Sequence, residues 1–139
     1  MKKMTITILL ILITLICHAP EYRCLWIGRP EPIQPYEKIW LAICQVESEN
    51  DPHAYHMEAD GWPAVGIAQI RWIRLREYNK ATGHQYQMKD MYDVKKSKQV
   101  FMYYASKLDD PDLIIRRWNG SGKSTYSYLK KVKTYFATK

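Results

Sequence analysis

The sequence predicts a single, mostly α-helical domain with a small β-hairpin between residues 53 and 70. Three observations lead to this prediction. The chain has 139 residues, which fits one domain. Apolar residues recur at helical spacing in several segments, and prolines, glycines and the Asn50-Asp51 pair separate these segments. No long stretch alternates apolar and polar residues convincingly enough to predict an extended strand.

The N-terminal 19 residues are typical of an export signal. Lys2 and Lys3 precede an apolar run over residues 6–16, which is too short for a comfortable membrane span of about 20 residues. We expect residues 1–19 to be a signal peptide or an N-terminal anchor, with membrane association as one outcome. The protein would then be exported, to the periplasm, the cell envelope or the medium. Cleavage, lipidation at Cys17 and retention of the leader all stay open.

Residues 20–35 contain four prolines and are expected to form an extended linker before a globular domain at residues 36–139. Two further cysteines lie at Cys24 and Cys44. They could form a disulfide in an oxidising compartment, or Cys44 could be a buried free thiol.

Five helices are expected in the domain. The first covers residues 36–49 and ends at Asn50-Asp51-Pro52, because the residue before a proline avoids the helical conformation. The second covers residues 72–81 and stops at Gly83. Asp93 should cap a third helix, a short fourth should run over residues 112–118, and Ser124 should cap the last.

The formal net charge is +7, and about +5 without Lys2 and Lys3. This mild basic character suits an anionic polymer such as cell wall, although solubility alone would explain it. A nucleic-acid-binding helical domain would also be basic, but the chain has no clustered Arg and Lys stripe with a recognition motif. We therefore expect no nucleic-acid partner.

Glu47 is the candidate catalytic residue. It falls on the last turn of the first predicted helix, beside its apolar stripe of Ile39, Ala42, Ile43 and Val46. Burial disfavours the charged carboxylate and raises its pKa, as a general acid that cleaves glycosidic bonds requires. By itself the signal is weak, since a glutamate at a helix end is usually a solvated charge.

Further motifs follow Glu47-Ser48 in order: Asn50-Asp51-Pro52 with Ala54, then Gly66-Ile67-Ala68-Gln69-Ile70, then Trp118-Asn119-Gly120, then Tyr128-Leu129-Lys130-Lys131-Val132. Their order and spacing over residues 39–132 resemble the lytic transglycosylase domain of the lysozyme-like superfamily. The resemblance implies a lysozyme-like, mostly helical fold, no metal and no cofactor. It implies Glu47 as the catalytic acid and Ser48, Gln69, Tyr104 and Asn119 as substrate-binding residues, with Tyr104 on the helix that faces the glutamate.

The sequence also departs from the family pattern. Trp118 and Gly120 replace a tyrosine and an alanine, Ala68 replaces a common methionine, and Asp51 and Ser97 stand where asparagines are usual. These departures leave the sugar preferences open. His53 and His56 have metal-like spacing, but they lie in a predicted loop without cysteine partners and are expected at the surface.

The resemblance implies that the substrate is the peptidoglycan glycan strand, cleaved to give 1,6-anhydro ends. A lysozyme-type muramidase is the first alternative and would need a second carboxylate, for which Asp51, Glu58, Asp60 and Asp93 are candidates. The second is a non-catalytic wall-binding component of a secretion, conjugation or phage assembly. The retained Glu47 favours an enzyme.

Overall fold

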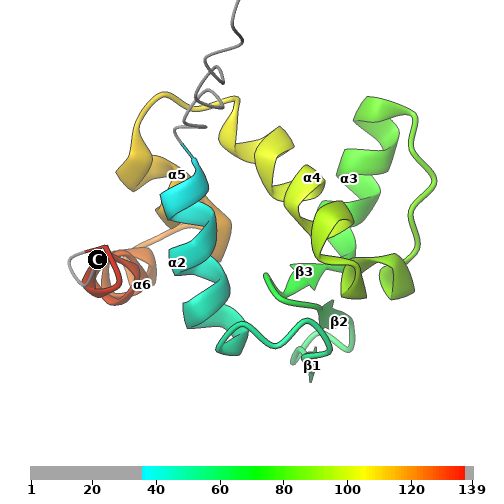
Figure 1. Ribbon diagram of the computed structural model, residues 1–139, viewed down its shortest axis with the longest axis horizontal. Coiled ribbons are helices and arrows are strands. Elements are labelled where there is room, and N and C mark those ends of the chain that lie inside the picture. Colours follow the sequence, from blue (N-terminus) through cyan, green and yellow to red (C-terminus); the bar gives the residue numbers. More distant parts are fainter. Residues whose placement is uncertain (1–35, 137–139) are drawn as a thin grey trace, which may run out of the picture. The chain divides into compact units, whose positions relative to one another are not determined.

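The computed structural model describes residues 36–136 of the chain (Figure 1). The predicted leader at 1–19, the proline-rich linker at 20–35, Cys17 and Cys24 lie outside the described residues. No helix within residues 36–136 is long and apolar enough to cross a bilayer.

The domain is mostly α-helical with a small antiparallel sheet, which confirms the predicted fold class. The helices are α2 (Glu37–Ser48), α3 (Trp72–Thr82), α4 (Val94–Ala105), α5 (Pro111–Asn119), α6 (Ser124–Thr134) and the 3-10 helix η1 (Met88–Tyr92). Strands β1 (Tyr55–Met57) and β2 (Pro63–Val65) form the expected hairpin, with His56 opposite Ala64. A short third strand, β3 (Ile70–Arg71), pairs with β2 and leads directly into α3.

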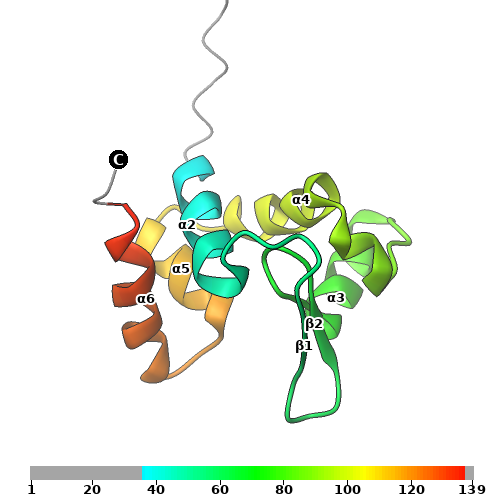
Figure 2. The same cartoon turned by 60° about the horizontal axis from the view of Figure 1, so that its bottom comes forward.

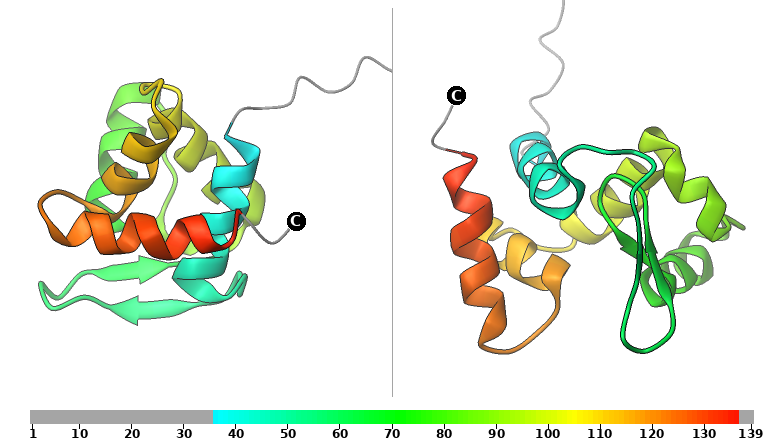
Figure 3. Two further views of the ribbon diagram at one scale, coloured as in Figure 1. Left: turned by 90° about the vertical axis from the view of Figure 1, so that its left-hand side faces the viewer. Right: turned by 90° about the horizontal axis from the view of Figure 1, so that it is seen from below.

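Helix α2 lies between α6 on one side and the sheet on the other, as Figures 1 and 2 both show. Its buried face packs against the centre of the core, where the Phe101 ring lies 5.3 Å from the ring of Trp40 and 5.2 Å from that of Trp118. These three rings come from α2, α4 and α5. In the left view of Figure 3 the hairpin strands lie along one side of the helices, and the last turn of α2 lies next to them. That turn carries Glu47.

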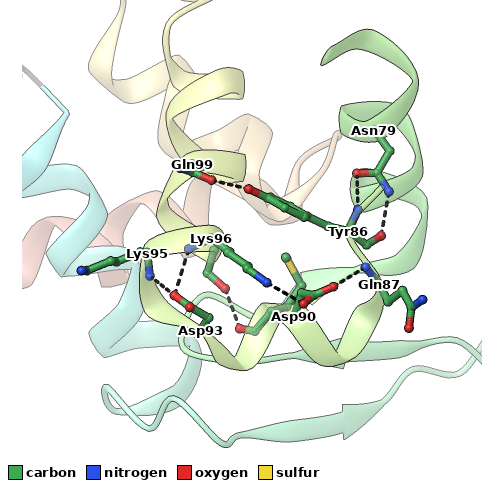
Figure 4. Close-up of polar contacts among 10 residues, drawn as sticks. Asn79, Tyr86, Gln87, Asp90, Asp93, Lys95, Lys96 and Gln99 are labelled. Carbon is green, nitrogen blue, oxygen red and sulfur yellow. Dashed lines mark hydrogen bonds and ion pairs between the residues drawn. The ribbon is translucent and has the colours of Figure 1, made fainter. Parts of the chain in front are cut away.

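Several helix ends follow the sequence prediction. The Asp93 carboxylate accepts hydrogen bonds from the backbone N–H groups of Lys95 and Lys96 and caps α4 as expected (Figure 4). Gly83 ends α3 in a left-handed conformation. Helix α2 ends earlier than predicted, at Ser48, because Glu49 and Asn50 both have positive φ angles of 57° and 67°.

Two predictions about where helices start were wrong. Ser124 is the first residue of α6 and does not cap it; the preceding Lys123 makes no side-chain cap. Helix α5 starts at Pro111, one residue early, because the Asp110 carboxylate accepts from the N–H of Asp112 and proline suits a first helical position. The 3-10 helix η1 was not predicted; at its start the Gln87 backbone N–H donates to the Asp90 carboxylate at 2.8 Å (Figure 4).

Cys44 is a free thiol, 1% exposed, on the buried face of α2. Burial raises the pKa of this thiol to about 12. Of the two alternatives for Cys44, the structure therefore has the buried free thiol, which stays protonated and unreactive at neutral pH.

The turn between β2 and β3 is held tightly against η1. Gly66 has a φ angle of +79°, and its N–H donates to the carbonyl oxygen of Ala54 at 2.8 Å. A Cβ atom at Gly66 would lie 2.0 Å from the carbonyl oxygen of Met91, which already accepts a 2.6 Å hydrogen bond from the Ser97 hydroxyl. Only glycine fits here, because the backbone conformation and the close approach both exclude a side chain.

We predict that Gly66→Ala lowers the free energy of unfolding by more than about 3 kcal/mol, since left-handed strain of about 1–2 kcal/mol adds to displacement of buried backbone. The matched control is Gly61→Ala, where φ is +80° but no atom lies within 4 Å of the added Cβ. Gly61→Ala should therefore show the strain alone. Urea unfolding measures both variants, and equal losses would show that the contact with Met91 is unimportant.

Candidate active site

Glu47 lies on the last turn of α2 and is partly buried. One of its carboxylate oxygens, Oε1, accepts a 2.6 Å hydrogen bond from the hydroxyl of Tyr128 on α6. Burial raises the pKa of the Glu47 carboxyl; the bond from Tyr128 and the charges of Arg74 and Arg71 oppose this rise without cancelling it. A carboxyl group with a raised pKa retains its proton closer to neutral pH, as a general acid must.

Tyr128 was not among the predicted site residues. The motif Tyr128 to Val132 is visible in the sequence. There, however, the helical spacing of Tyr128 with Leu129 and Val132 indicates only the apolar side of a helix. In the structure its hydroxyl turns to Glu47 while Val132 is fully buried in the core. Burial, and then the charge of Glu47, raises the pKa of Tyr128, so the phenol stays protonated and remains a hydrogen-bond donor.

The Glu47 carboxyl borders a small polar pocket. Its walls come from α2, the hairpin, β3, α3 and the end of α5. The lining residues are Glu47, Glu58, Gln69, Arg71, Arg74, Trp118 and Asn119. The pocket thus brings together three of the five predicted site residues: Glu47, Gln69 and Asn119.

Gln69 both supports and lines this pocket. Its side-chain N–H₂ group donates to the carbonyl oxygens of Gly66 at 2.9 Å and Ala54 at 3.3 Å, which fixes a residue whose φ angle is +48°. Ser48 has a different place. Its hydroxyl lies 2.7 Å from the carbonyl oxygen of Ile67 and fastens the turn at residues 66–69 to the end of α2, outside the pocket lining.

Asn119 is the last residue of α5 and is partly exposed. Its side chain makes no hydrogen bond to any group within residues 36–136, so its amide is available to a ligand. The neighbouring Trp118 is 5% exposed, and its indole N–H donates to the carbonyl oxygen of Ala68 at 3.3 Å. This bond joins α5 to the turn that carries Gln69.

Arg74 supplies a positive charge near Glu47 that the sequence analysis missed. Its guanidinium donates to the carbonyl oxygen of Trp118 at 2.9 Å and lies 4.0 Å from the centre of the Trp118 ring. Burial lowers the pKa of Arg74, but arginine titrates so far above neutral pH that it stays charged. Nothing in the sequence separates Arg74 from Arg76, the other arginine of α3, because the partners of Arg74 come from α5.

Tyr104 lies on α4 and contacts α3. Its hydroxyl is 2.8 Å from the carbonyl oxygen of Arg74 and 3.2 Å from a carboxylate oxygen of Glu77. Its ring lies 5.4 Å from the Arg74 guanidinium. Tyr104 therefore borders a neighbouring, larger pocket and helps to position Arg74, while the hydrogen bond to Glu47 comes from Tyr128.

Of the four candidate second carboxylates, Glu58 alone lines the Glu47 pocket. It forms a 3.1 Å ion pair with Arg71. The other three have structural partners: the carboxylate of Asp51 accepts from the N–H of His53, that of Asp60 from the N–H of Trp62, and that of Asp93 caps α4.

His53 and His56 are exposed, as expected for surface residues. Within residues 36–136 no three His, Cys, Asp or Glu side chains are grouped so that they could hold a metal ion. Comparison of the chain with protein-family models, with curated proteins and with solved structures finds no match.

We predict that Tyr128→Phe raises the pKa of Glu47 further. The hydroxyl of Tyr128 donates to the carboxylate form, so its removal disfavours ionisation while the burial that dominates the pKa remains. Carbon-detected NMR of glutamate-labelled protein over a pH titration measures the shift. The matched control is Tyr126→Phe, an exposed tyrosine on the same helix, which should leave the Glu47 titration unchanged. An unchanged or lower Glu47 pKa in Tyr128→Phe would contradict the role of this bond.

Proposed function

We propose that the protein is a lytic transglycosylase that cleaves the bond between N-acetylmuramic acid and N-acetylglucosamine in peptidoglycan and leaves 1,6-anhydro ends. The observation that carries this proposal is the partly buried Glu47, hydrogen-bonded by Tyr128 and open to a pocket with Asn119 and Gln69. The order of the motifs along the chain and the mostly helical fold with its small hairpin support it. Export through the N-terminal leader belongs to the same proposal.

In the proposed reaction Glu47 acts twice. It first gives its proton to the glycosidic oxygen, so the bond from that oxygen to C1 of the muramic ring breaks and the leaving sugar departs as an alcohol. The Glu47 carboxylate then takes the proton of the C6 hydroxyl of the same ring, and the C6 oxygen bonds to C1. No water is consumed, and Glu47 ends protonated, ready for another cycle.

The surroundings of Glu47 suit both steps. Burial keeps the acid protonated before the reaction. When the carboxylate forms, Tyr128 donates to it and the positive charges of Arg74 and Arg71 stabilise it. The C6 hydroxyl is tethered to the reacting ring, and this high effective concentration favours it over water.

A muramidase is the second candidate, because Glu58 lines the same pocket as Glu47. In a hydrolase a second carboxylate activates water or attacks the sugar directly. Here Glu58 forms an ion pair with Arg71, whereas a second catalytic carboxylate must be free to contact water or the sugar. A non-catalytic wall-binding component is the remaining alternative.

We predict that Glu47→Gln lowers turnover of purified peptidoglycan by at least about a hundredfold, the usual scale for loss of general acid catalysis. Glutamine keeps the size of the side chain and can accept the Tyr128 hydrogen bond, so the fold should persist. The control is Glu49→Gln, two residues along and exposed, which should retain activity. Release of sugar ends measures turnover. A fully active Glu47→Gln would overturn the proposal, and an inactive wild-type protein would favour a binding component.

The role of Glu58 separates the two reactions. We predict that wild-type products carry 1,6-anhydro ends, which are one water lighter than hydrolytic products and resist chemical reduction, and that Glu58→Gln still makes them. Asp60→Gln is the control on the same hairpin, and mass spectrometry of the products gives the answer. If the products instead have reducing muramic ends and Glu58→Gln abolishes their formation, the enzyme is a muramidase with Glu58 as the second carboxylate.

A further inference from the structure

A second, larger pocket adjoins the Glu47 pocket. The two pockets share three lining residues, Arg71, Arg74 and Asn119, so they lie side by side with a common wall. The larger pocket extends between α3, α4 and α5. Its charged lining consists of Arg71, Arg74, Lys107 and Arg117 with one acidic residue, Glu77. The larger pocket therefore has four cations against one acidic residue, whereas in the smaller pocket the carboxyls of Glu47 and Glu58 face the two shared arginines.

Two of the four cations, Lys107 and Arg117, have neither an acidic partner nor a backbone carbonyl partner within residues 36–136. Arg71 is paired with Glu58, and Arg74 donates to backbone carbonyls of α5. Lys107 and Arg117 form no ion pair within residues 36–136. Both are exposed. They are therefore available to an anion from outside the chain.

Aromatic and polar neighbours hold Lys107 in place. Its ammonium lies 3.8 Å from the centre of the Tyr103 ring and 2.5 Å from the Tyr103 hydroxyl. The Tyr104 ring is 5.7 Å away. The carboxylate of Glu77 already accepts from the Tyr104 hydroxyl. The pocket thus has a positioned ammonium and an unpaired guanidinium, and its one acidic residue, Glu77, accepts a hydrogen bond from Tyr104.

We propose that this pocket binds the carboxylates of the peptide stems that peptidoglycan carries on its muramic residues. The inference rests on the proposed function and names the part of the substrate that the second pocket holds. The N-acetylated sugar rings of a stem-bearing strand are uncharged, so they give no reason for unpaired cations beside the cleavage site. The anionic groups of that polymer are the free carboxylates of its peptides, and ammonium and guanidinium groups are their natural partners.

The shared wall of the two pockets supports this assignment. A stem is attached to the muramic ring whose C1 bond would be broken, so its first carboxylates stay close to Glu47. A group bound in the larger pocket would orient the ring in the smaller one, and binding energy gained away from the reacting bond then serves the reaction. A nucleic acid would instead require a longer track of cations along a backbone.

A matched pair of ligands tests the proposal: N-acetylmuramoyl-L-alanyl-D-glutamate, with two free carboxylates, and its neutral diamide. We predict that the full-length protein binds the diacid about five- to tenfold more tightly than the diamide, a preference that fits two partly exposed ion pairs. Lys107→Gln/Arg117→Gln should reduce the preference to less than about twofold. Both side chains are exposed, so the double variant should fold, and its unfolding curve checks this.

The control is Lys89→Gln/Lys95→Gln, which removes two exposed lysines outside the pocket and should keep the full preference. Titration by calorimetry or NMR measures all the affinities without cleavage, so an inactive protein would end the proposed function while the binding result still stands. Equal affinity for diacid and diamide, or an equal loss in the control variant, would overturn the inference. A single-stranded oligonucleotide that binds more tightly than the diacid, and loses affinity in the pocket variant, would overturn it in favour of phosphate binding.

Discussion

The hydrogen bond from Tyr128 to Glu47 is the contact on which the site depends. It joins residues 81 positions apart in the sequence and connects the end of α2 to α6. The Glu47 carboxyl is partly buried, which favours its neutral form, and the Tyr128 hydroxyl still donates a hydrogen bond to it when it ionises. Such a pair can release and regain a proton without a large rearrangement, because either state of the carboxyl is compatible with the phenol. In the proposed reaction, the packing of α6 beside α2 therefore serves the acid as well as the core.

The turn at residues 66–69 is the second fixed point of the site. Gly66 permits the close approach to Met91, Ser48 binds the Ile67 carbonyl, and the Trp118 indole binds that of Ala68. These bonds tie the turn to η1, α2 and α5 at once. Gln69 can then hold a left-handed backbone conformation with its side chain in the pocket wall. Ser48 was predicted to bind substrate, but in the structure its hydroxyl fixes the backbone of the turn that holds Gln69.

The two neighbouring pockets differ in the charge of their linings. Near Glu47, the buried Arg74 stabilises a carboxylate, and the pair of Glu58 with Arg71 leaves little net charge at the pocket wall. Farther along, Lys107 and Arg117 carry charge that no acid of the described domain neutralises. An uncharged sugar would suit the pocket that Glu47 lines, and an anionic substituent would suit the larger pocket. A polymer that carries both groups would occupy both pockets.

The sequence by itself determined the mostly helical fold, the hairpin, the Asp93 cap and the place of Glu47 at a helix end, because periodicity, turn residues and caps act over a few neighbouring residues. Its prediction that Ser124 caps α6 was wrong, because the helix starts one residue earlier and Ser124 is its first residue. Only the tertiary structure decided that Tyr128 hydrogen-bonds Glu47 while Tyr104 supports Arg74, and that Glu58 is the carboxylate that shares the pocket. These pairings depend on how helices and the hairpin pack across long stretches of chain. The raised pKa of Glu47 depends on the same packing, since burial is a property of the assembled domain.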